Sequence, residues 1–572
     1  MNTPIPMHKL SAILLTGAAV FGQYSFAQTP TYGWSRSLGT VDLDHLEPAP
    51  NGRILTLGTF TGAPDLDLGP EELILNGPGG GANAYVCAAQ EDGTLEWAIA
   101  IGSTTNVNPG DLHVNADGGF HVHANFRGTL DADPDPDNEV PLAAGTSFDQ
   151  FIGRYNAEGG LIWAARFGNK FDLIGSVSVV DPAGNVYITL RPTSTLDVDP
   201  GPATVNYGPN PQNEYILVKL APDGSFLWVR RLGLISPYTL FAPGTGGLTA
   251  VGTFSGSQLI GTAPDTLSLS GSEPFGDVFV IHFDAEGKPL SALTFGGSGS
   301  EVVNGAAIGL DGSITIAGQF TETTDLEPGP GTTAFTSLGS HDLFAMKLSA
   351  GGTLLWAATW GDNFSNDMEA MALDGYGDVY IAAPLLSAYD VDPGPDSYML
   401  QSDIGFNAYL LKLDGSNGEF MFAYPMSDGT TGHITTRQLA LTTNGTILTG
   451  GTFRASTDMD PLGGEDILTV QVDPSEEVYI RSFYQDIGLA VPTTTAEAML
   501  LYPVPCTDVL MVHQPQAAPV AYAVTDAQGR LALSGTLPPG IQALPVSTLA
   551  PGAYAITMHA EGQRNTARFV KQ

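Results

Sequence analysis

Asp390-Val391-Asp392-Pro393-Gly394-Pro395 is one of six copies of a short acidic motif, and the spacing of these copies predicts the fold. Each copy begins five residues after an aromatic or apolar residue, which itself follows a glycine by eight residues. The fourth unit keeps this frame but has Leu259 where the motif would begin. The chain is therefore read as seven units of about 65 residues, and repetition at such a period indicates a repeat architecture. The other copies begin at Asp65, Asp131, Asp197, Asp325 and Asp458.

Four short strands are expected in each unit. Two form a hairpin around a glycine, as in 112–116 with 120–124, and a third carries a large residue such as Trp163. The fourth opens with a polar residue before alternating apolar positions, and no segment has a sustained helical period. The residues that open this strand are Asn83, Asp149, Glu214, Asp277, Asp342, Asn407 and Asp466.

Four antiparallel strands per repeat, arranged radially, describe the blade of a β-propeller. We therefore expect an all-β protein with a seven-bladed propeller over residues 28–490. The acidic motif is expected in an insertion between the hairpin and the strand with the polar opening residue. The units begin with a lone tryptophan strand at Trp34 and end in mid-unit, so one blade can be built from both ends of the chain.

Composition limits the classes of function. Glycine (70 residues) and proline (41) are abundant and charged residues make up only 14%, which favours short strands and tight turns over disorder or helices. The formal net charge of −39 disfavours nucleic acid and anionic membranes as partners and suits solubility or cation binding. Cys87 and Cys506 lie too far apart in sequence to suggest a disulfide framework, and both are expected to be buried thiols.

The N-terminus has the pattern of a secretory signal peptide. Lys9 precedes an apolar run of about a dozen residues, and Ser25-Phe26-Ala27 provides a small-x-small cleavage site, so residues 1–27 are assigned to the signal. No later stretch approaches 18 uninterrupted apolar residues, so no membrane-spanning segment is expected. Residues 491–499 resemble a linker, and 500–572 form a second small unit of alternating strands, expected to be an Ig-like β-sandwich.

This second unit resembles the C-terminal sorting domain of type IX secretion cargo from the Bacteroidota. Val504 departs from the asparagine usual in the first motif of that family. The resemblance implies contact with the secretion machinery through residues 500–572, export through the periplasm and a final location at the cell surface or in the medium. The repeats also resemble the propeller repeats of such cargo. The matching residues are Tyr502, Pro503, Pro505, Asp526, Gly529, Leu549, Gly552, Tyr554 and Lys571.

The acidic motifs are candidate calcium sites. Residues i and i+2 of an extended chain face the same way, so paired carboxylates can converge on one ion. Calcium needs six to eight oxygens, so carbonyls and water would have to complete the shell. The alternative is a rigid solvated turn in which aspartate caps backbone amides. The candidate ligands are Asp65, Asp67, Asp131, Asp133, Asp135, Asp137, Asp197, Asp199, Asp325, Glu327, Asp390, Asp392, Asp458 and Asp460, and the copy at 131–137 is the richest.

Other chemistry has weaker support in the sequence. His113, His121 and His123 could form a zinc site on two paired strands, but ordinary strand filling also explains them. The repeated tryptophans are expected to pack between blades. No nucleophile elbow, phosphate-binding glycine loop or paired-cysteine motif is present, and no catalytic constellation is visible.

The sequence thus predicts an exported propeller that binds a glycan or protein ligand and is not an enzyme. Two alternatives remain open: a propeller-type polysaccharide lyase or glycosidase, and a structural matrix component. Clustered carboxylates or histidines near the central channel would favour the enzyme, whereas a bare apolar channel would favour the binding module.

Overall fold

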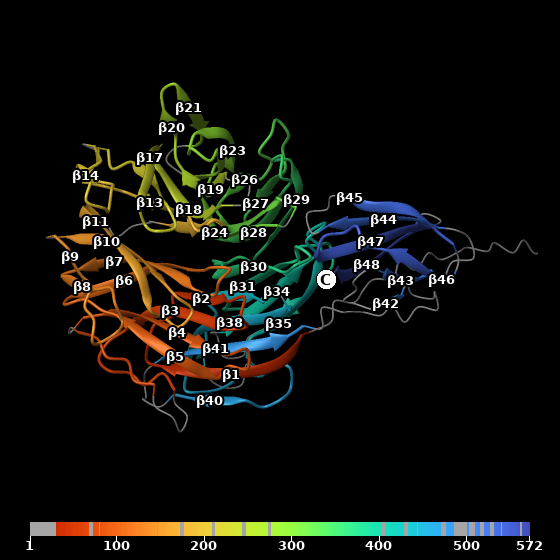
Figure 1. Ribbon diagram of the computed structural model, residues 1–572, viewed down its shortest axis with the longest axis horizontal. Helices are drawn as coiled ribbons and strands as arrows, with labels where there is room; N and C mark the ends of the chain where they lie inside the picture. The colour runs from red at the N-terminus through yellow and green to blue at the C-terminus, as the bar shows by residue number, and fades with distance from the viewer. Residues whose placement is uncertain are drawn as a thin grey trace, which may run out of the picture. The chain divides into compact units, whose positions relative to one another are not determined.

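The computed structural model comprises two compact units, Met1–Gln485 and Asp486–Gln572 (Figure 1). The signal segment, the linker, Cys506 and the sorting-motif residues Pro503, Pro505 and Gly529 lie outside the described residues. The described residues are 30–485, without 68–72, 79–80, 146, 172–176, 209–211, 243–246, 273–275, 310, 402–406, 428–432, 443 and 471–475, together with 500–502, 509–514, 520–526, 531–538, 540–560 and 563–571.

The first unit is a seven-bladed β-propeller whose blades are antiparallel sheets. In the first six blades the strands follow one another in chain order from the innermost to the outermost. Blade one contains β2 (His45–Pro48), β3 (Ile54–Phe60), β4 (Asn83–Ala89) and β5 (Leu95–Ile101). Blade two contains β6 (Asn106–Val114), β7 (Phe120–Arg127), β10 (Phe148–Tyr155) and β11 (Leu161–Phe171). Blade three contains β12 (Ser178–Val180), β13 (Val186–Leu190), β16 (Tyr215–Leu220) and β17 (Phe226–Gly233). Blade four contains β18 (Ile235–Phe241), β19 (Leu248–Phe254), β22 (Asp277–Phe283) and β23 (Pro289–Gly297). Blade five contains β24 (Glu301–Ile308), β25 (Ile314–Phe320), β28 (Asp342–Leu348) and β29 (Leu354–Trp360). Blade six contains β30 (Ala370–Leu373), β31 (Val379–Leu385), β34 (Asn407–Leu413) and β35 (Phe420–Pro425).

The seventh blade closes the ring with strands from both ends of the unit. Its outermost strand is the N-terminal β1 (Thr31–Gly39), which pairs antiparallel with β41 (Glu477–Tyr484), as the red and blue strands in Figure 1 show. The inner strands are β36 (His433–Ile434), β37 (Gln438–Leu441) and β38 (Thr446–Arg454). The predicted use of both ends in one blade is confirmed.

Small hairpins are inserted between the second and third strands of the blades. The first insertion has only an isolated bridge between Asp65 and Ile74 among its described residues, and the fourth keeps a hairpin although it lacks the acidic motif. The hairpins are β8 (Thr129–Asp131) with β9 (Pro141–Ala143), β14 (Leu196–Asp197) with β15 (Asn206–Tyr207), β20 (Ser257–Thr262) with β21 (Asp265–Ser270), β26 (Thr323–Asp325) with β27 (Ala334–Thr336), β32 (Tyr389–Asp390) with β33 (Met399–Leu400), and β39 (Ser456–Asp458) with β40 (Ile467–Thr469).

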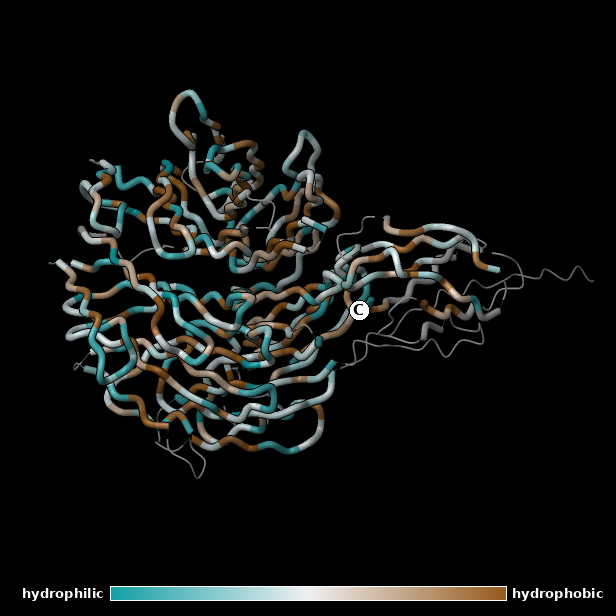
Figure 2. The backbone as a smooth tube through the Cα atoms, in the orientation of Figure 1, coloured by the Kyte–Doolittle hydropathy of each residue, from teal (hydrophilic) through white to brown (hydrophobic). Residues whose placement is uncertain are grey.

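The hydrophobic core consists of layers between neighbouring blades. One cluster joins Leu57 and Val86 of blade one to Val122 and Phe151 of blade two, and six further clusters join the other neighbouring pairs around the ring. A middle strand therefore buries both faces; every residue of β28 is buried. Hydrophobic and hydrophilic stretches alternate along the blades in Figure 2. This two-sided burial explains the near-continuous apolar runs in the middle strands.

Tryptophans on outermost strands pack against the next blade, as predicted. Trp356 Nε1 donates to the carbonyl of Gly415, 3.2 Å away in the following blade. A methyl group on Gly418 would lie only 2.6 Å from Cε3 of the same ring, and Gly418 has φ +77°. Trp34 and Trp163 make the equivalent contacts with Gly93 and Gly224. The glycine is needed both for the turn and for the close approach of the indole.

The second unit contains two antiparallel sheets that share one core. The residues of this core come from both sheets, including Leu510, Leu544, Val524, Ile556 and Phe569, so the sheets pack as a small sandwich. The sheets are β42 (Leu500–Tyr502), β43 (Val509–Gln514), β46 (Gly540–Pro545), and β45 (Leu531–Leu537), β44 (Val520–Asp526), β47 (Gly552–Ala560), β48 (Gln563–Lys571).

Candidate functional site

The antiparallel order gives the propeller two different edges. The tight turns after the innermost strand and between the two outer strands lie at one edge, which we call the turn face. The inserted hairpins lie at the opposite edge, which we call the hairpin face. The acidic motifs therefore belong to the hairpin face, away from the turns that carry the inter-blade glycines.

The first acid of each motif organises its own hairpin loop. Asp390 Oδ1 accepts the amide of Asp392 at 3.1 Å and that of Tyr398 at 2.8 Å. This carboxylate acts as a cap that holds both ends of the loop together. The same two-amide pattern occurs at Asp65, Asp131, Asp197, Asp325 and Asp458.

The copy at 131–137 repeats the capping along the loop. Asp131, Asp133 and Asp135 each accept the amide two residues ahead, at 3.2, 3.1 and 3.0 Å. Asp133 also accepts the side-chain amide of Asn138. Within the described part of the chain, no group of three or more His, Cys, Asp or Glu side chains is arranged to hold a metal ion. The observed contacts are those of the capped turn, and calcium binding stays a prediction.

The polar residues that open the third strand of each blade, counted from the innermost strand, are also caps. Asp342 Oδ2 accepts the amide of Leu338 at 2.9 Å, and Asp277 Oδ2 accepts that of Ser272 at 2.9 Å. The seventh unit corrects the sequence prediction: Phe453 pairs with Glu477, so Glu477 and not Asp466 opens this strand. Asp466 instead precedes β40 in the inserted hairpin, where the same polar–apolar alternation occurs.

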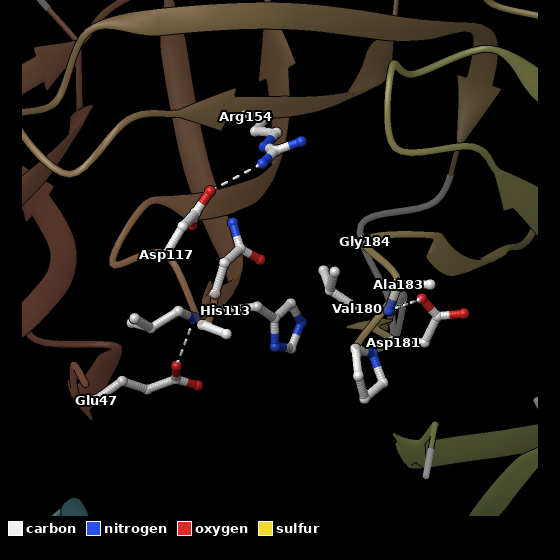
Figure 3. A pocket seen from close by; sticks show the side chains of 12 residues that line it. Glu47, His113, Asp117, Arg154, Val180, Asp181, Ala183 and Gly184 are labelled. Atoms are coloured by element: carbon white, nitrogen blue, oxygen red, sulfur yellow. Dashed lines mark hydrogen bonds and ion pairs between the residues drawn. The ribbon is translucent and has the colours of Figure 1, made fainter. Parts of the chain in front are cut away.

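A cavity of about 490 Å³ opens on the turn face between blades one, two and three (Figure 3). Arg154 Nη2 lies 3.1 Å from Asp117 Oδ2, and Glu47 Oε2 accepts the amide of Val114 at 3.0 Å. Asp181 caps its own turn by accepting the amide of Ala183 at 3.0 Å. The wall is thus polar, with carboxylates from three blades and one guanidinium. We call it the first cleft.

Two buried donors beside the first cleft have no acceptor among the residues that the structure describes. Among the described residues, none accepts from Nδ2 of Asn115 or from Nε of Arg154, although both atoms are buried. Burying a polar atom without a partner costs free energy, and native proteins leave few such atoms.

A related cavity of about 510 Å³ lies between blades five, six and seven. Lys347 has the same position in its strand as Arg154, because Lys347 pairs across the sheet with Trp356 as Arg154 pairs with Trp163. Asp311 and Asp374 occupy the turn positions of Asp117 and Asp181. We call this the second cleft; the repeat therefore builds the same kind of acidic cleft with one basic residue twice.

Polar side chains of the innermost strands connect successive blades. His45 bonds the carbonyl of Gly110 at 2.7 Å, and Asp111 Oδ2 accepts the amide of Ser178 at 2.7 Å and its hydroxyl at 3.1 Å. His113 Nε2 lies 3.0 Å from the same hydroxyl. We call these residues together with Glu47 the inner-strand cluster. These hydrogen bonds join one blade to the next, so the cluster stabilises the ring.

Two acids of this cluster have pKa values displaced in opposite directions. Burial raises the pKa of Glu47 to about 7, and the negative charge of Asp111 adds to the rise. Burial also pushes the pKa of Asp111 upward, but the hydrogen bond with His123 and the charges of His113 and His45 more than offset this, so it lies below its usual value. Glu47 and Asp111 therefore differ in protonation near neutral pH. Neither Glu47 nor Asp111 was predicted from the sequence as a site residue, because neither lies in a recognisable local motif.

The three histidines proposed for zinc bond different partners. His113 contacts Ser178, His121 lies 3.2 Å from Asn115 Oδ1, and His123 Nε2 lies 2.7 Å from Gln150 Oε1. His121 and His123 are almost completely buried. Burial lowers the pKa of His121 to about 3, helped by the nearby charge of His113. These contacts are those of core histidines.

Comparison with protein families decides the nature of the second unit. The model described as "Secretion system C-terminal sorting domain" matches residues 500–572. Residues 500–572 are a C-terminal sorting domain. In the structure, the sorting domain places Tyr554 against Phe569 with ring centroids 5.6 Å apart, and Tyr554 donates to the carbonyl of Ala550. The resemblance drawn from the sequence is confirmed for this segment.

The sorting domain implies export across the outer membrane to the cell surface or the medium, which confirms the predicted location. It also implies contact with the type IX secretion machinery. No helix in the described part of the chain has the length and apolarity needed to cross a membrane.

Comparisons with solved structures gave weak matches to other proteins. U3-55K shares 10% identity at a TM-score of 0.41, with 79% of this chain and 99% of that one covered. The WD40 repeats of RRP9 share 9% identity at a TM-score of 0.39, with 80% and 99% covered. A protein of unknown function from Dyadobacter fermentans shares 12% identity at 0.31, with 80% and 98% covered. Comparison with curated proteins gave no match. The propeller assignment rests on the sheet order.

Proposed function

We propose that this exported propeller is a binding module and that its turn-face clefts take a hydroxyl-rich ligand of the glycan class. The observation that supports this most directly is the first cleft, a cavity of about 490 Å³ lined by Arg154 and by the carboxylates of Asp117 and Asp181. A concave site with a few convergent polar groups is the usual form of a small-ligand site.

Glycan hydroxyls match this wall because each hydroxyl both donates and accepts. Carboxylates accept from a hydroxyl, while an amide or guanidinium donates to it. In the second cleft the Tyr376 side chain is 69% exposed, so its ring is available to stack on a sugar face. The net charge of −39 disfavours polyanionic glycans, so we expect a neutral one.

A binding screen with the mature chain tests the proposal. Neutral and acidic oligosaccharides and candidate proteins are presented to wild type with and without calcium. A neutral glycan hit that is weakened at least tenfold by Arg154→Ala supports the proposal. Arg53→Ala is the matched control, because the Arg53–Glu96 ion pair lies outside the cleft lining. Binding only to a protein, or glycan binding that Arg154→Ala leaves unchanged, would contradict the proposal.

A glycosidase is the second candidate, because Glu47 lines the same cleft with its pKa raised to about 7 while that of Asp111 is lowered. A protonated acid beside an ionised carboxylate is the pattern of acid-catalysed glycoside cleavage. The hydrogen bonds of Asp111 to Ser178 favour a structural role for that residue. Release of reducing ends from a bound glycan by wild type but not by Glu47→Gln would support the enzyme.

A further inference from the structure

A buried pair of acids lies where blade four meets blade five. Asp277 opens the third strand of blade four and Glu301 begins β24 of blade five; they are 7% and 1% exposed. A point next to Gly296, where a methyl group would stand, is 2.7 Å from both Asp277 Oδ1 and Glu301 Oε2. Gly296 therefore leaves a small space bordered by two carboxylate oxygens.

In blades two and three the equivalent acid is neutralised by an arginine. In blade two Arg166 Nη1 lies 2.6 Å from Asp149, and in blade three Arg231 Nε lies 2.7 Å from Glu214. The strand register places Thr294 of blade four at this arginine position. Blade four thus lacks the arginine, as blade five does at Thr359, and Asp277 instead has a second acid nearby, Glu301 of blade five.

The oxygens around this space make no hydrogen bond of good geometry with the described residues, although the Thr324 hydroxyl and the Gly297 amide lie close enough to Glu301 to lower its pKa. Oδ1 of Asp277 and both oxygens of Glu301 make no hydrogen bond within the described residues. The hydroxyl of Thr324 is also buried, makes no hydrogen bond of good geometry with the described residues, and lies beside Glu301. Thr324 is held there because β26 pairs with β23 at Gly297. The neutral Thr324 oxygen is therefore a further potential ligand beside the two acids.

We propose that Asp277, Glu301 and Thr324 form a site for one hard divalent cation of the calcium class. The donor set contains only oxygen, which hard cations prefer. A divalent ion offsets both negative charges, as arginine offsets the single acid in blades two and three. This site is separate from the acidic loops of the hairpin face and from the clefts of the turn face.

The alternative occupant of the space is a proton. Burial, to which the negative charge of Asp277 adds, raises the pKa of Glu301 to about 7. If the two acids shared a proton, the propeller would become less stable as the pH rises towards 7, and calcium would not change its stability. A bound cation would instead stabilise the propeller above pH 7, where both acids are ionised.

Calcium content and melting temperature of the mature chain test the site. The protein is dialysed against chelator, equilibrated with calcium alone at pH 8, and measured by mass spectrometry of the metal and by thermal unfolding. We expect Glu301→Gln to lose one equivalent of calcium relative to wild type, together with part of the calcium-dependent rise in melting temperature. Thr294→Arg, which copies Arg231, is expected to lose the same equivalent while still folding.

The matched control is the double variant Asp133→Asn and Asp135→Asn, which alters the richest acidic loop and should retain the equivalent that Glu301→Gln loses. If Glu301→Gln does not fold, Thr294→Arg decides the question. Equal calcium content in wild type and Thr294→Arg would overturn the proposal. It would also fail if wild type bound no calcium, or if its melting temperature responded to pH but not to calcium.

Discussion

The contact between Trp356 and Gly418 gives a stability prediction that can be worked out from the structure. Replacing Gly418 with alanine puts a side chain at φ +77° and a methyl group 2.6 Å from the indole. The left-handed backbone costs about 1–2 kcal/mol for a residue with a Cβ. Relieving the overlap in a packed layer costs about 1–3 kcal/mol more. We therefore expect Gly418→Ala to lower the free energy of unfolding by about 2–5 kcal/mol.

A second glycine separates these two contributions. Gly52 has φ +83°, but a methyl group there would meet nothing within 4 Å. Gly52→Ala should therefore show only the backbone cost. The assay is urea unfolding of the mature chain, followed by the fluorescence of the blade tryptophans. Trp356→Ala removes the overlap, so the excess effect of Gly418→Ala over Gly52→Ala should disappear in that background. Equal effects of the two glycine variants in wild type would refute the proposed inter-blade packing.

Three further predictions concern export, calcium and pH. Deleting residues 500–572 should leave the propeller in the periplasm, as measured by fractionation and immunoblot; efficient surface appearance without them would refute the sorting role. Chelation should lower the melting temperature, and Asp133→Asn with Asp135→Asn should remove part of that change if the acidic loop at 131–137 binds calcium; an unchanged curve would argue against it. Because the folded pKa of Glu47 is raised to about 7 from 4.5, its stabilising contribution is full below pH 4.5 and is lost as the pH rises through 7. In chelator, Glu47→Gln should flatten this part of the stability profile, and an identical slope in the variant would contradict the assignment.

The repeat made much of the fold predictable from the sequence. A glycine turn and a tryptophan at constant spacing mark the same position in successive blades, so Trp356 could be assigned to an inter-blade layer before its partner Gly418 was known. The capping role of Asp390 could also be anticipated, since aspartate in a tight loop readily accepts nearby amides. These features depend on contacts that are local or that recur at the repeat period.

The clefts and the buried acids could not be predicted in this way. Asp111 meets Ser178 in the next blade, and Glu301 meets Asp277 across a blade boundary, and no local pattern in the sequence indicates either contact. The residue predicted to open β41 in the seventh unit was wrong for a related reason. Asp466 precedes a short apolar strand just as a true opening residue does, whereas Glu477 holds that position in the sheet.

Polar residues near the channel bear on the alternatives that the sequence left open. The inner-strand cluster has the carboxylates and histidines expected of an enzyme, but Asp111 and His113 both bond Ser178 of the next blade. A structural use of these groups leaves the turn-face clefts as the better candidates for ligand contact. We therefore propose that the ligand binds in the turn-face clefts.

Hydrogen exchange of the mature chain with and without a glycan identified in the screen tests that proposal most directly. Binding in the first cleft predicts slower amide exchange in the turns at 113–117 and 180–184 when the glycan is added, with the hairpin at 129–143 unchanged. Protection confined to the hairpin at 129–143, with no change at the two turns, would contradict the account.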